Sequence, residues 1–258
     1  MILNEKEKVE EILTSKRPAT KSDIMIIAKY LRNEMKCDVS ETLAMLSSIM
    51  TKINRNFNPI KSAKYLESIA IKAENIPLKK IDFIKITSRE LGTIGNIESL
   101  KLQRLLFVIL VFSKYHNILS DNNNNWCNIS IGELYRYAKV STRNAKEKAI
   151  FLNRLSKMGY ISFSAQNTNL NIKCNIVDNE PDKDSIKIND IRELGYQYIN
   201  LSNPSQFTYC ENCGVIMKKK GKKDFSTKTC SACLRVARNE ENLNWFHQLD
   251  KAYHPQTQ

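Results

Sequence analysis

Four of the seven cysteines form two close pairs, and this spacing constrains the chain more than any other feature of its sequence. The pattern reads Cys210-x2-Cys213-x16-Cys230-x2-Cys233. Each pair can hold a metal ion from a tight turn, and two pairs supply the four thiolates of a tetrahedral zinc site. A closed shell of thiolates leaves no position for a reactive water, so we expect one structural Zn²⁺ and no catalytic metal.

The residues around these cysteines, 206–258, predict a small zinc-binding domain. Gly214 directly follows the first pair, where a tight turn needs backbone freedom. The interval 215–229 is long enough for a short hairpin, and Cys233 opens a helical pattern that runs to Gln248. This segment resembles a treble-clef or zinc-ribbon finger with a C-terminal helix.

The N-terminus and the apolar runs bear on where the protein works. The first residues are charged and helical in pattern, without the apolar core of a signal peptide. The longest apolar run, Leu105–Phe112, is far shorter than the roughly 20 residues that a membrane span needs. We therefore expect a cytoplasmic protein with no membrane segment, where cysteines more often bind metals than form disulfides. The remaining cysteines, Cys37, Cys127 and Cys174, are expected to be small buried side chains.

The chain is strongly basic. Its 258 residues contain 40 Lys and Arg against 27 Asp and Glu, a formal net charge of +13. Residues 99–170 alone carry 10 basic and 3 acidic side chains. This excess favours a polyanionic partner, either a nucleic acid or an acidic protein surface. The hydrophobic fraction of 42% is ordinary for a globular protein, so a substantial core is expected.

Residues 1–98 predict a helical N-terminal module. Apolar residues recur at three- and four-residue spacing in four segments, and Ser22 and Ser40 are candidate N-caps. A short strand pattern ends at Ile86, and Thr87 with Glu90 forms a capping-box pattern. The four helical segments are Asn4–Leu13, Ser22–Met35, Ser40–Ile53 and Pro59–Ala73.

Residues 99–177 predict a winged helix-turn-helix domain. The expected order is helix, short strand, helix, turn, helix and β-hairpin, which resembles that fold. The corresponding segments are Ser99–Asn117, Trp126–Ser130, Ile131–Ala138, Thr142–Met158, Tyr160–Ser164 and Leu170–Val177. An acidic connector, 178–205, then leads to the cysteine-containing segment. The fold class is therefore expected to be mainly α with small β-sheets, an α+β arrangement of these domains.

The helix expected over Thr142–Met158 carries the candidate DNA-reading surface. Ser141 would cap it, and Ala145, Ala149, Leu152 and Leu155 would face the core. The first turns of such a helix enter the major groove, where Arg can pair with guanine and Asn with adenine, while later basic residues contact phosphates. The predicted DNA-binding residues here are Thr142, Arg143, Asn144, Lys146, Arg154 and Lys157. A solvated face of an ordinary helix is the alternative interpretation.

Two loops add candidate contacts to nucleic acid. Gln166–Asn169 would form the wing, touching DNA or serving only as a turn. Between the cysteine pairs, five lysines at a hairpin tip are predicted to contact phosphates, namely Lys218, Lys219, Lys220, Lys222 and Lys223. The same lysines could instead serve solubility or bind an acidic protein.

The sequence argues against an enzyme. Its three histidines, His116, His247 and His254, leave none within the cysteine pattern, where finger-like nucleases need them. Neither a GxxxxGK[ST] phosphate loop nor an HExxH or GxSxG motif is present. We therefore expect a binding protein without a catalytic site.

The overall plan resembles proteins encoded by phages and prophages of low-GC Gram-positive bacteria. The resemblance is carried by Leu102–Tyr115, by the Asn-Asn-Trp126 loop and by the Cys-x2-Cys-Gly turn. It implies a DNA-binding protein of a mobile element that regulates transcription or initiates replication on double-stranded DNA. The alternative is an adaptor or inhibitor that binds a host or phage protein, and RNA binding also stays open. Nothing in the sequence marks an oligomerisation seam.

Overall fold

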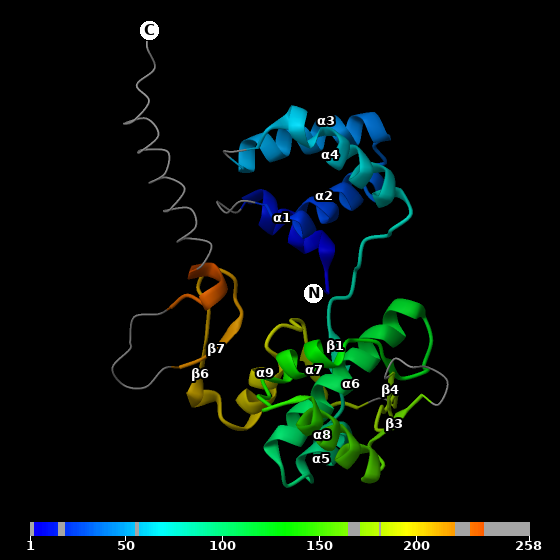
Figure 1. The fold of residues 1–258 in the computed structure, drawn as a ribbon, viewed down its shortest axis with the longest axis vertical. Coiled ribbons are helices and arrows are strands. Elements are labelled where there is room, and N and C mark those ends of the chain that lie inside the picture. Colours follow the sequence, from blue (N-terminus) through cyan, green and yellow to red (C-terminus); the bar gives the residue numbers. More distant parts are fainter. Residues whose placement is uncertain are drawn as a thin grey trace. The chain divides into compact units, whose positions relative to one another are not determined.

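The computed structural model is mainly helical, with small β-sheets (Figure 1). It describes residues 3–14, 19–54, 57–164, 171–180, 182–219 and 228–234. The chain divides into two compact units. The first unit comprises residues 1–85 together with Lys187–Asp190, and the second comprises 86–186 and 191–258.

The first unit is built from four helices, and their side chains make a common core. Each of the last three helices begins at a polar N-cap whose side chain accepts a backbone N–H, at Thr20, Asp38 and Asn58. The predicted caps Ser22 and Ser40 are therefore wrong, because Thr20 and Asp38 are followed three residues later by the acidic partner of a capping box. The helices are α1 (Glu5–Thr14), α2 (Lys21–Asn33), α3 (Val39–Ile53) and α4 (Pro59–Glu74).

A buried ion pair lies inside the first unit. The Lys29 ammonium binds both carboxylate oxygens of Glu5, at 2.8 and 3.0 Å, and the Lys79 amide donates to the same carboxylate at 2.9 Å. Both charged side chains are less than a tenth exposed. The pair therefore links α1, α2 and the segment after α4. Separating the two residues would leave a buried charge without its partner, which is costly.

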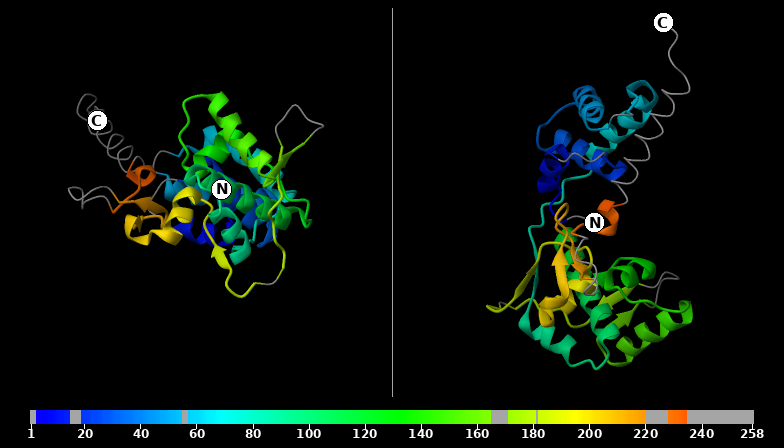
Figure 2. Two further views of the ribbon diagram at one scale, coloured as in Figure 1. Left: turned by 90° about the horizontal axis from the view of Figure 1, so that it is seen from below. Right: turned by 90° about the vertical axis from the view of Figure 1, so that its left-hand side faces the viewer.

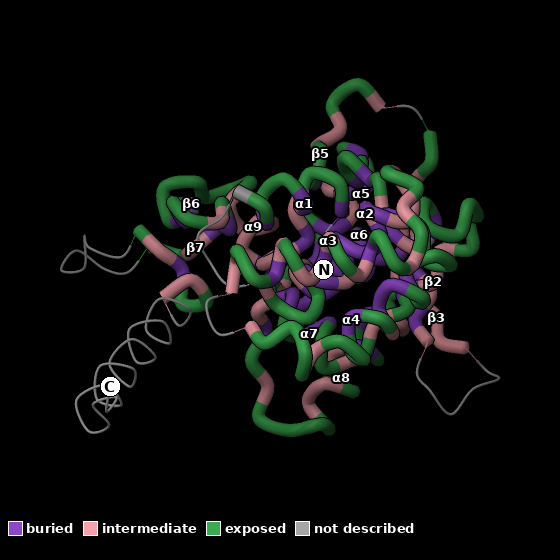
Figure 3. Tube along the Cα trace, turned by 90° about the horizontal axis from the view of Figure 1, so that it is seen from above, coloured by how far each residue is buried: buried purple, intermediate pink, exposed green. Residues whose placement is uncertain are grey.

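The second unit is organised around one long helix, α6 (Leu100–Ser120). Its middle, from Leu105 to Ser113, is buried throughout (Figure 3). Within the described residues, no helix combines the length and apolarity needed to cross a membrane. The other helices here are α5 (Ser88–Gly95), α7 (Ile131–Ala138), α8 (Ala145–Lys157), α9 (Leu194–Ser202) and the short η1 (Pro204–Gln206).

Three short strands of the second unit form one antiparallel sheet in the order β2-β4-β3. These strands are β2 (Trp126–Cys127), β3 (Ile161–Phe163) and β4 (Ile172–Cys174). Cys127 faces Ile172 across the sheet, and Ile161 faces Cys174. The central strand, β4, is the last of the three in the sequence, and α7 and α8 lie between β2 and β3 along the chain.

The remaining strands form two separate ribbons. β6 (Phe207–Tyr209) and β7 (Ile216–Lys218) pair as an antiparallel hairpin and lie side by side in Figure 2 (yellow and orange). β1 (Ile84–Ile86) and β5 (Ile186–Ile188) form a two-stranded sheet, and the division between the two units runs through both strands.

Within the predicted module 1–98, residues up to Lys85 belong to the first compact unit and residues from Ile86 belong to the second. The reason is a buried network that holds α5 against α6. The Glu90 carboxylate accepts from the Lys114 ammonium at 2.7 Å, from the Thr87 amide at 2.8 Å and from the Asp178 amide at 2.7 Å. The capping box predicted at Thr87 and Glu90 is present, and its acidic member also completes this network.

Helix α9 packs against the C-terminal end of α7 through a glycine. A side-chain carbon built on Gly195 would lie 2.1 Å from the carbonyl oxygen of Ala138, far inside van der Waals contact. Only glycine therefore allows the two backbones to approach this closely.

We predict that Gly195→Ala destabilises the protein by about 2–3 kcal/mol, because α9 or the end of α7 must shift to admit the methyl group. Gly92→Ala is the matched control, since Gly92 also lies in a helix but has no atom within 4 Å of its added carbon. The control should stabilise α5 by up to about 1 kcal/mol through helix propensity. Urea unfolding curves measure both changes, and equal midpoints for the two variants would contradict the close approach.

Candidate metal centre and nucleic-acid interface

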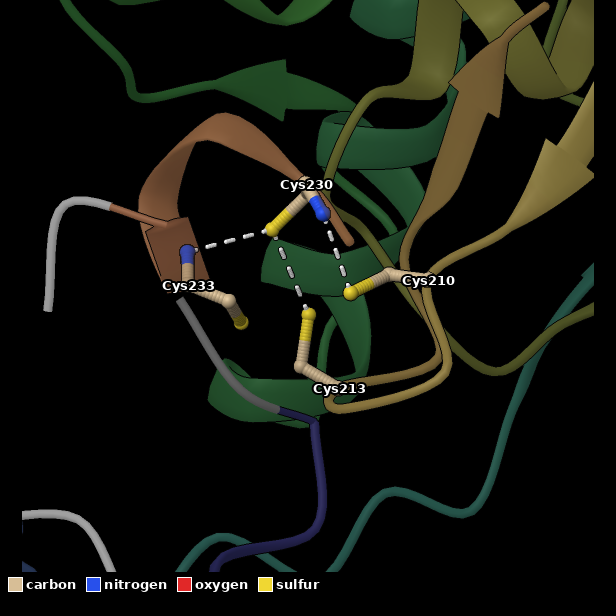
Figure 4. Close-up of side chains that lie close together, drawn as sticks. All are labelled: Cys210, Cys213, Cys230 and Cys233. Atoms are coloured by element: carbon tan, nitrogen blue, oxygen red, sulfur yellow. Dashed lines mark hydrogen bonds between the residues drawn. The ribbon is translucent and has the colours of Figure 1, made fainter. Parts of the chain in front are cut away.

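The four cysteines predicted as metal ligands come together in the structure. The Sγ atoms of Cys210, Cys213, Cys230 and Cys233 all lie within 4.8 Å of one another, an arrangement that could hold a metal ion (Figure 4). The Cys213 and Cys230 sulfurs are 3.7 Å apart. A zinc ion with Zn–S bonds of about 2.3 Å separates its tetrahedral sulfurs by about 3.8 Å, so the spacing suits such an ion. We call these four residues the cysteine cluster.

The cluster is built by two short backbone turns. In the first, the Gly214 amide donates to the Cys210 carbonyl at 2.8 Å, and Gly214 adopts a φ of +67° that favours glycine. In the second, the Leu234 amide donates to the Cys230 carbonyl at 2.9 Å. Two amides also point at sulfur, from Cys230 to Cys210 Sγ (3.2 Å) and from Cys233 to Cys230 Sγ (3.4 Å). These donors stabilise thiolates, which are the form that binds metal.

The electrostatics of the cluster distinguish its members. Burial raises the pKa of the Cys210 thiol, but the amides of Cys230, Asn212 and Cys213 together outweigh it and bring that pKa to about 7. Burial and the neighbouring cysteines raise the pKa of Cys233 well above its ordinary value. One thiol therefore ionises readily, whereas a full set of thiolates needs a cation to offset their mutual repulsion.

All three cysteines outside the cluster were predicted to be buried, and two of them are. Cys127 and Cys174 are buried in the three-stranded sheet, as predicted, and burial raises the pKa of Cys174 to about 12. Cys37 is half-buried, with its sulfur 3.8 Å from that of Met45. None of the three belongs to the cluster.

The hairpin predicted between the cysteine pairs falls mostly on residues 220–227, which lie outside the described residues. The β6–β7 hairpin flanks the first pair, because the Cys210-x2-Cys213-Gly214 turn itself reverses the chain. Lys218 consequently lies in β7 opposite Phe207, not at a loop tip. Lys219 binds the carbonyls of Gln206 through its amide and Ser205 through its ammonium. Lys220, Lys222 and Lys223 lie outside the described residues, as does the wing candidate 166–169.

The predicted DNA-reading helix begins later than the sequence analysis placed it. Helix α8 starts at Ala145, and its N-cap is Asn144 instead of Ser141. The Asn144 side-chain oxygen accepts the Glu147 amide at 2.9 Å, and the Glu147 carboxylate accepts the Arg143 amide at 2.6 Å. Thr142 and Arg143 therefore precede the helix. Because Asn144 caps it, its amide oxygen is already engaged, and pairing with adenine would cost that cap.

The first two turns of α8 are exposed on more sides than expected. Leu152 and Leu155 are buried as predicted, but Ala145 and Ala149 are exposed. The predicted core face is wrong in this half, because Lys148 and Phe151 turn toward the body instead. The Tyr135 hydroxyl donates to the Lys148 carbonyl at 2.8 Å, and the Lys101 ammonium lies 5.6 Å from the Phe151 ring centre. The first turns of α8 therefore expose Ala145, Lys146, Ala149 and Ile150 to solvent.

The basic side chains of this region are free of carboxylate partners among the described residues. Arg143, Lys146, Arg154 and Lys157 are all exposed. The nearest acidic residue in the sequence, Glu147, accepts the Arg143 amide through its carboxylate, and its own amide donates to the Asn144 side chain. A surface of exposed cations around an exposed helix end attracts anions.

Two residues that the sequence analysis did not single out connect the cysteine cluster to the rest of the second unit. The Arg192 guanidinium donates to the carbonyl oxygen of Cys213 at 2.8 Å. The Glu193 carboxylate forms an ion pair with the Lys139 ammonium. Glu193 and Lys139 both have positive φ values, a non-glycine feature that sequence alone does not reveal.

Comparison with known proteins adds no relative. No protein-family model matches the chain, and no curated sequence and no solved structure gives a significant match.

Proposed function

We propose that this chain is a DNA-binding protein that reads double-stranded DNA with the N-terminal end of α8. The observation that carries the proposal is the exposure of this helix end, flanked by exposed cations without acidic partners among the described residues. Ala145 and Ala149 are small and exposed, so they would let the helix backbone approach a groove closely. Arg143 and Lys146 stand at the same end, where base edges would be contacted.

The element order supports a winged helix-turn-helix for the region around α8. The order is α6, β2, α7, α8, β3 and β4, and the sheet order β2-β4-β3 places the last strand between the other two. A winged helix has this succession, with its recognition helix directly before the hairpin. By its resemblance to phage and prophage proteins, we further propose a role in transcription regulation or replication initiation in a mobile element.

We also propose that the metal of the cysteine cluster is a single structural zinc ion in a finger-like domain. Four thiolates within 4.8 Å of one another suit zinc, and a closed set of four leaves no position for a reacting water. When bound, the ion would supply folding energy rather than chemistry. This role agrees with a protein that binds DNA and has no enzymatic activity.

Fluorescence anisotropy with a labelled duplex of about 30 base pairs tests the proposal directly. The zinc-loaded protein should bind, and its affinity should fall steeply as salt rises, because counterions are released when phosphates are contacted. Negligible binding at low salt would reject DNA as the partner. The alternative would then be an adaptor or inhibitor that binds a host protein.

We predict that Arg143→Ala weakens binding to a selected DNA site by about 1–3 kcal/mol and relaxes the preference at one position. Lys157→Ala, at the far end of α8, should instead weaken all sequences alike and reduce the salt slope by about 1. Lys72→Ala is the control, because Lys72 is an exposed lysine of α4 in the first unit. If Arg143→Ala keeps the full site preference while remaining folded, α8 is not the reading helix.

A further inference from the structure

The backbone turn of the cysteine cluster is connected to the start of α9 by two contacts. The first is the hydrogen bond of 2.8 Å from the Arg192 guanidinium to the Cys213 carbonyl. The second is the packing of the Tyr196 ring on Phe207, the first residue of β6, with ring centres 5.6 Å apart. Arg192 is held in turn by the Gln197 side chain, which donates to its carbonyl at 2.7 Å. The start of α9 is therefore in direct contact with the turn of the first cysteine pair and with β6.

The N-terminal end of α9 also contacts the turn that precedes α8. Glu193 pairs with Lys139, whose ammonium also lies 5.5 Å from the Tyr196 ring centre. Gly195 packs directly on the Ala138 carbonyl. On the other side, the Arg104 guanidinium donates to the Lys139 carbonyl at 3.0 Å. Lys139 is the left-handed C-cap of α7, so its backbone sets the direction in which the chain leaves toward α8.

We propose that Arg192 and Glu193 are positioning residues that couple metal occupancy of the cysteine cluster to the turn between α7 and α8. A metal ion bound by Cys213 would hold the backbone turn that includes the Cys213 carbonyl in one conformation. Arg192 donates to that carbonyl, and the neighbouring Glu193 pairs with Lys139, so a shift of the turn would displace Lys139. Metal loading would thus set the orientation of α8 although no metal ligand belongs to the helix-turn-helix. The inference rests on the metal site proposed above, and its effect on DNA affinity rests on the proposed function.

Two backbone amides report on this coupling. The Lys139 amide donates to the Arg136 carbonyl at 3.3 Å, and the Val140 amide donates to the Tyr135 carbonyl at 3.1 Å. Hydrogen exchange of these amides in the full-length protein, zinc-loaded and chelated, measures the stability of the turn. We expect chelation to raise their exchange rate about tenfold in the wild type, within the usual range of coupling between sites. In Arg192→Ala the rate should change less than about twofold on chelation.

The control and a second variant keep the test decisive. Arg136→Ala removes an exposed arginine of α7, whose guanidinium lies over the Tyr137 ring, and should keep the wild-type response to chelation. Glu193→Gln leaves the Arg192–Cys213 bond intact but breaks the ion pair with Lys139, so it should also abolish the response. If Arg192→Ala loses zinc altogether, the response of Glu193→Gln to chelation decides whether the coupling exists.

Unchanged exchange at Lys139 and Val140 in the chelated wild type would overturn the coupling, as would a wild-type response in Glu193→Gln. The DNA-binding measurement tests the proposed function independently of the coupling. A metal-sensitive turn in a protein that does not bind DNA would leave the coupling intact and remove the proposed function. DNA binding by a protein in which chelation leaves the exchange at Lys139 and Val140 unchanged would support the proposed function and overturn the coupling.

Discussion

Cys230→Ser is expected to abolish tight zinc binding and to unfold the β6–β7 hairpin with its two cysteine turns. The Cys230 sulfur lies 3.7 Å from Cys213 Sγ and accepts the Cys233 amide, so its loss removes a ligand and disturbs both cysteine pairs. Metal binding in comparable small fingers contributes on the order of 10 kcal/mol to folding. A hairpin of three-residue strands with a core of a few side chains cannot replace that contribution.

Native mass spectrometry and metal analysis of the full-length protein after dialysis measure this effect. The wild type should retain one zinc per chain, and Cys230→Ser should retain far less. Cys37→Ser is the matched control, because Cys37 is half-buried but outside the cluster. If Cys230→Ser keeps zinc at wild-type affinity, the cluster is not the metal site.

The second large effect is expected at the buried network that joins α5 to α6. Glu90→Gln leaves the Lys114 ammonium without its carboxylate in a site where the Glu90 side chain is fully buried. Breaking one side of a buried ion pair costs about 3–5 kcal/mol, because the remaining charge stays desolvated. Two amides, from Thr87 and Asp178, also lose a charged acceptor.

Urea unfolding followed by tryptophan fluorescence measures this loss, since both tryptophans lie beyond residue 86 in the sequence. Glu34→Gln is the control, because the Glu34–Lys80 pair is exposed to solvent and should matter little. A double variant, Glu90→Leu with Lys114→Met, should recover much of the stability by removing both charges. A Glu90→Gln midpoint equal to that of Glu34→Gln would show that the network does not stabilise the fold.

The features that the sequence predicted well are local. Helix α7 begins and ends at the predicted residues, and the Thr87–Glu90 capping box is present, because both depend on neighbouring side chains. Each cysteine pair forms as expected for the same reason, since it needs only one tight turn. The start of α8 was missed although its signal was local. Asn144 stands three residues before Glu147, and this spacing identifies the N-cap better than Ser141 does.

The features that the sequence did not reveal are contacts between distant residues. The close approach of Gly195 to Ala138 and the bond from Arg192 to the Cys213 carbonyl join segments whose relation no periodicity encodes. The exposure of Ala145 and Ala149 has the same origin. A helical pattern shows which residues share a face, but the tertiary structure decides how much of that face is covered.

The first unit combines two segments that lie far apart in the sequence, and this has a consequence for biosynthesis. This unit consists of residues 1–85 completed by Lys187–Asp190, where Ile188 is buried and the Lys187 ammonium lies 4.6 Å from the Phe83 ring centre. During translation, the N-terminal helices leave the ribosome long before their last strand has been made. The finished unit must therefore wait for about a hundred intervening residues, so its assembly cannot simply follow the order of synthesis.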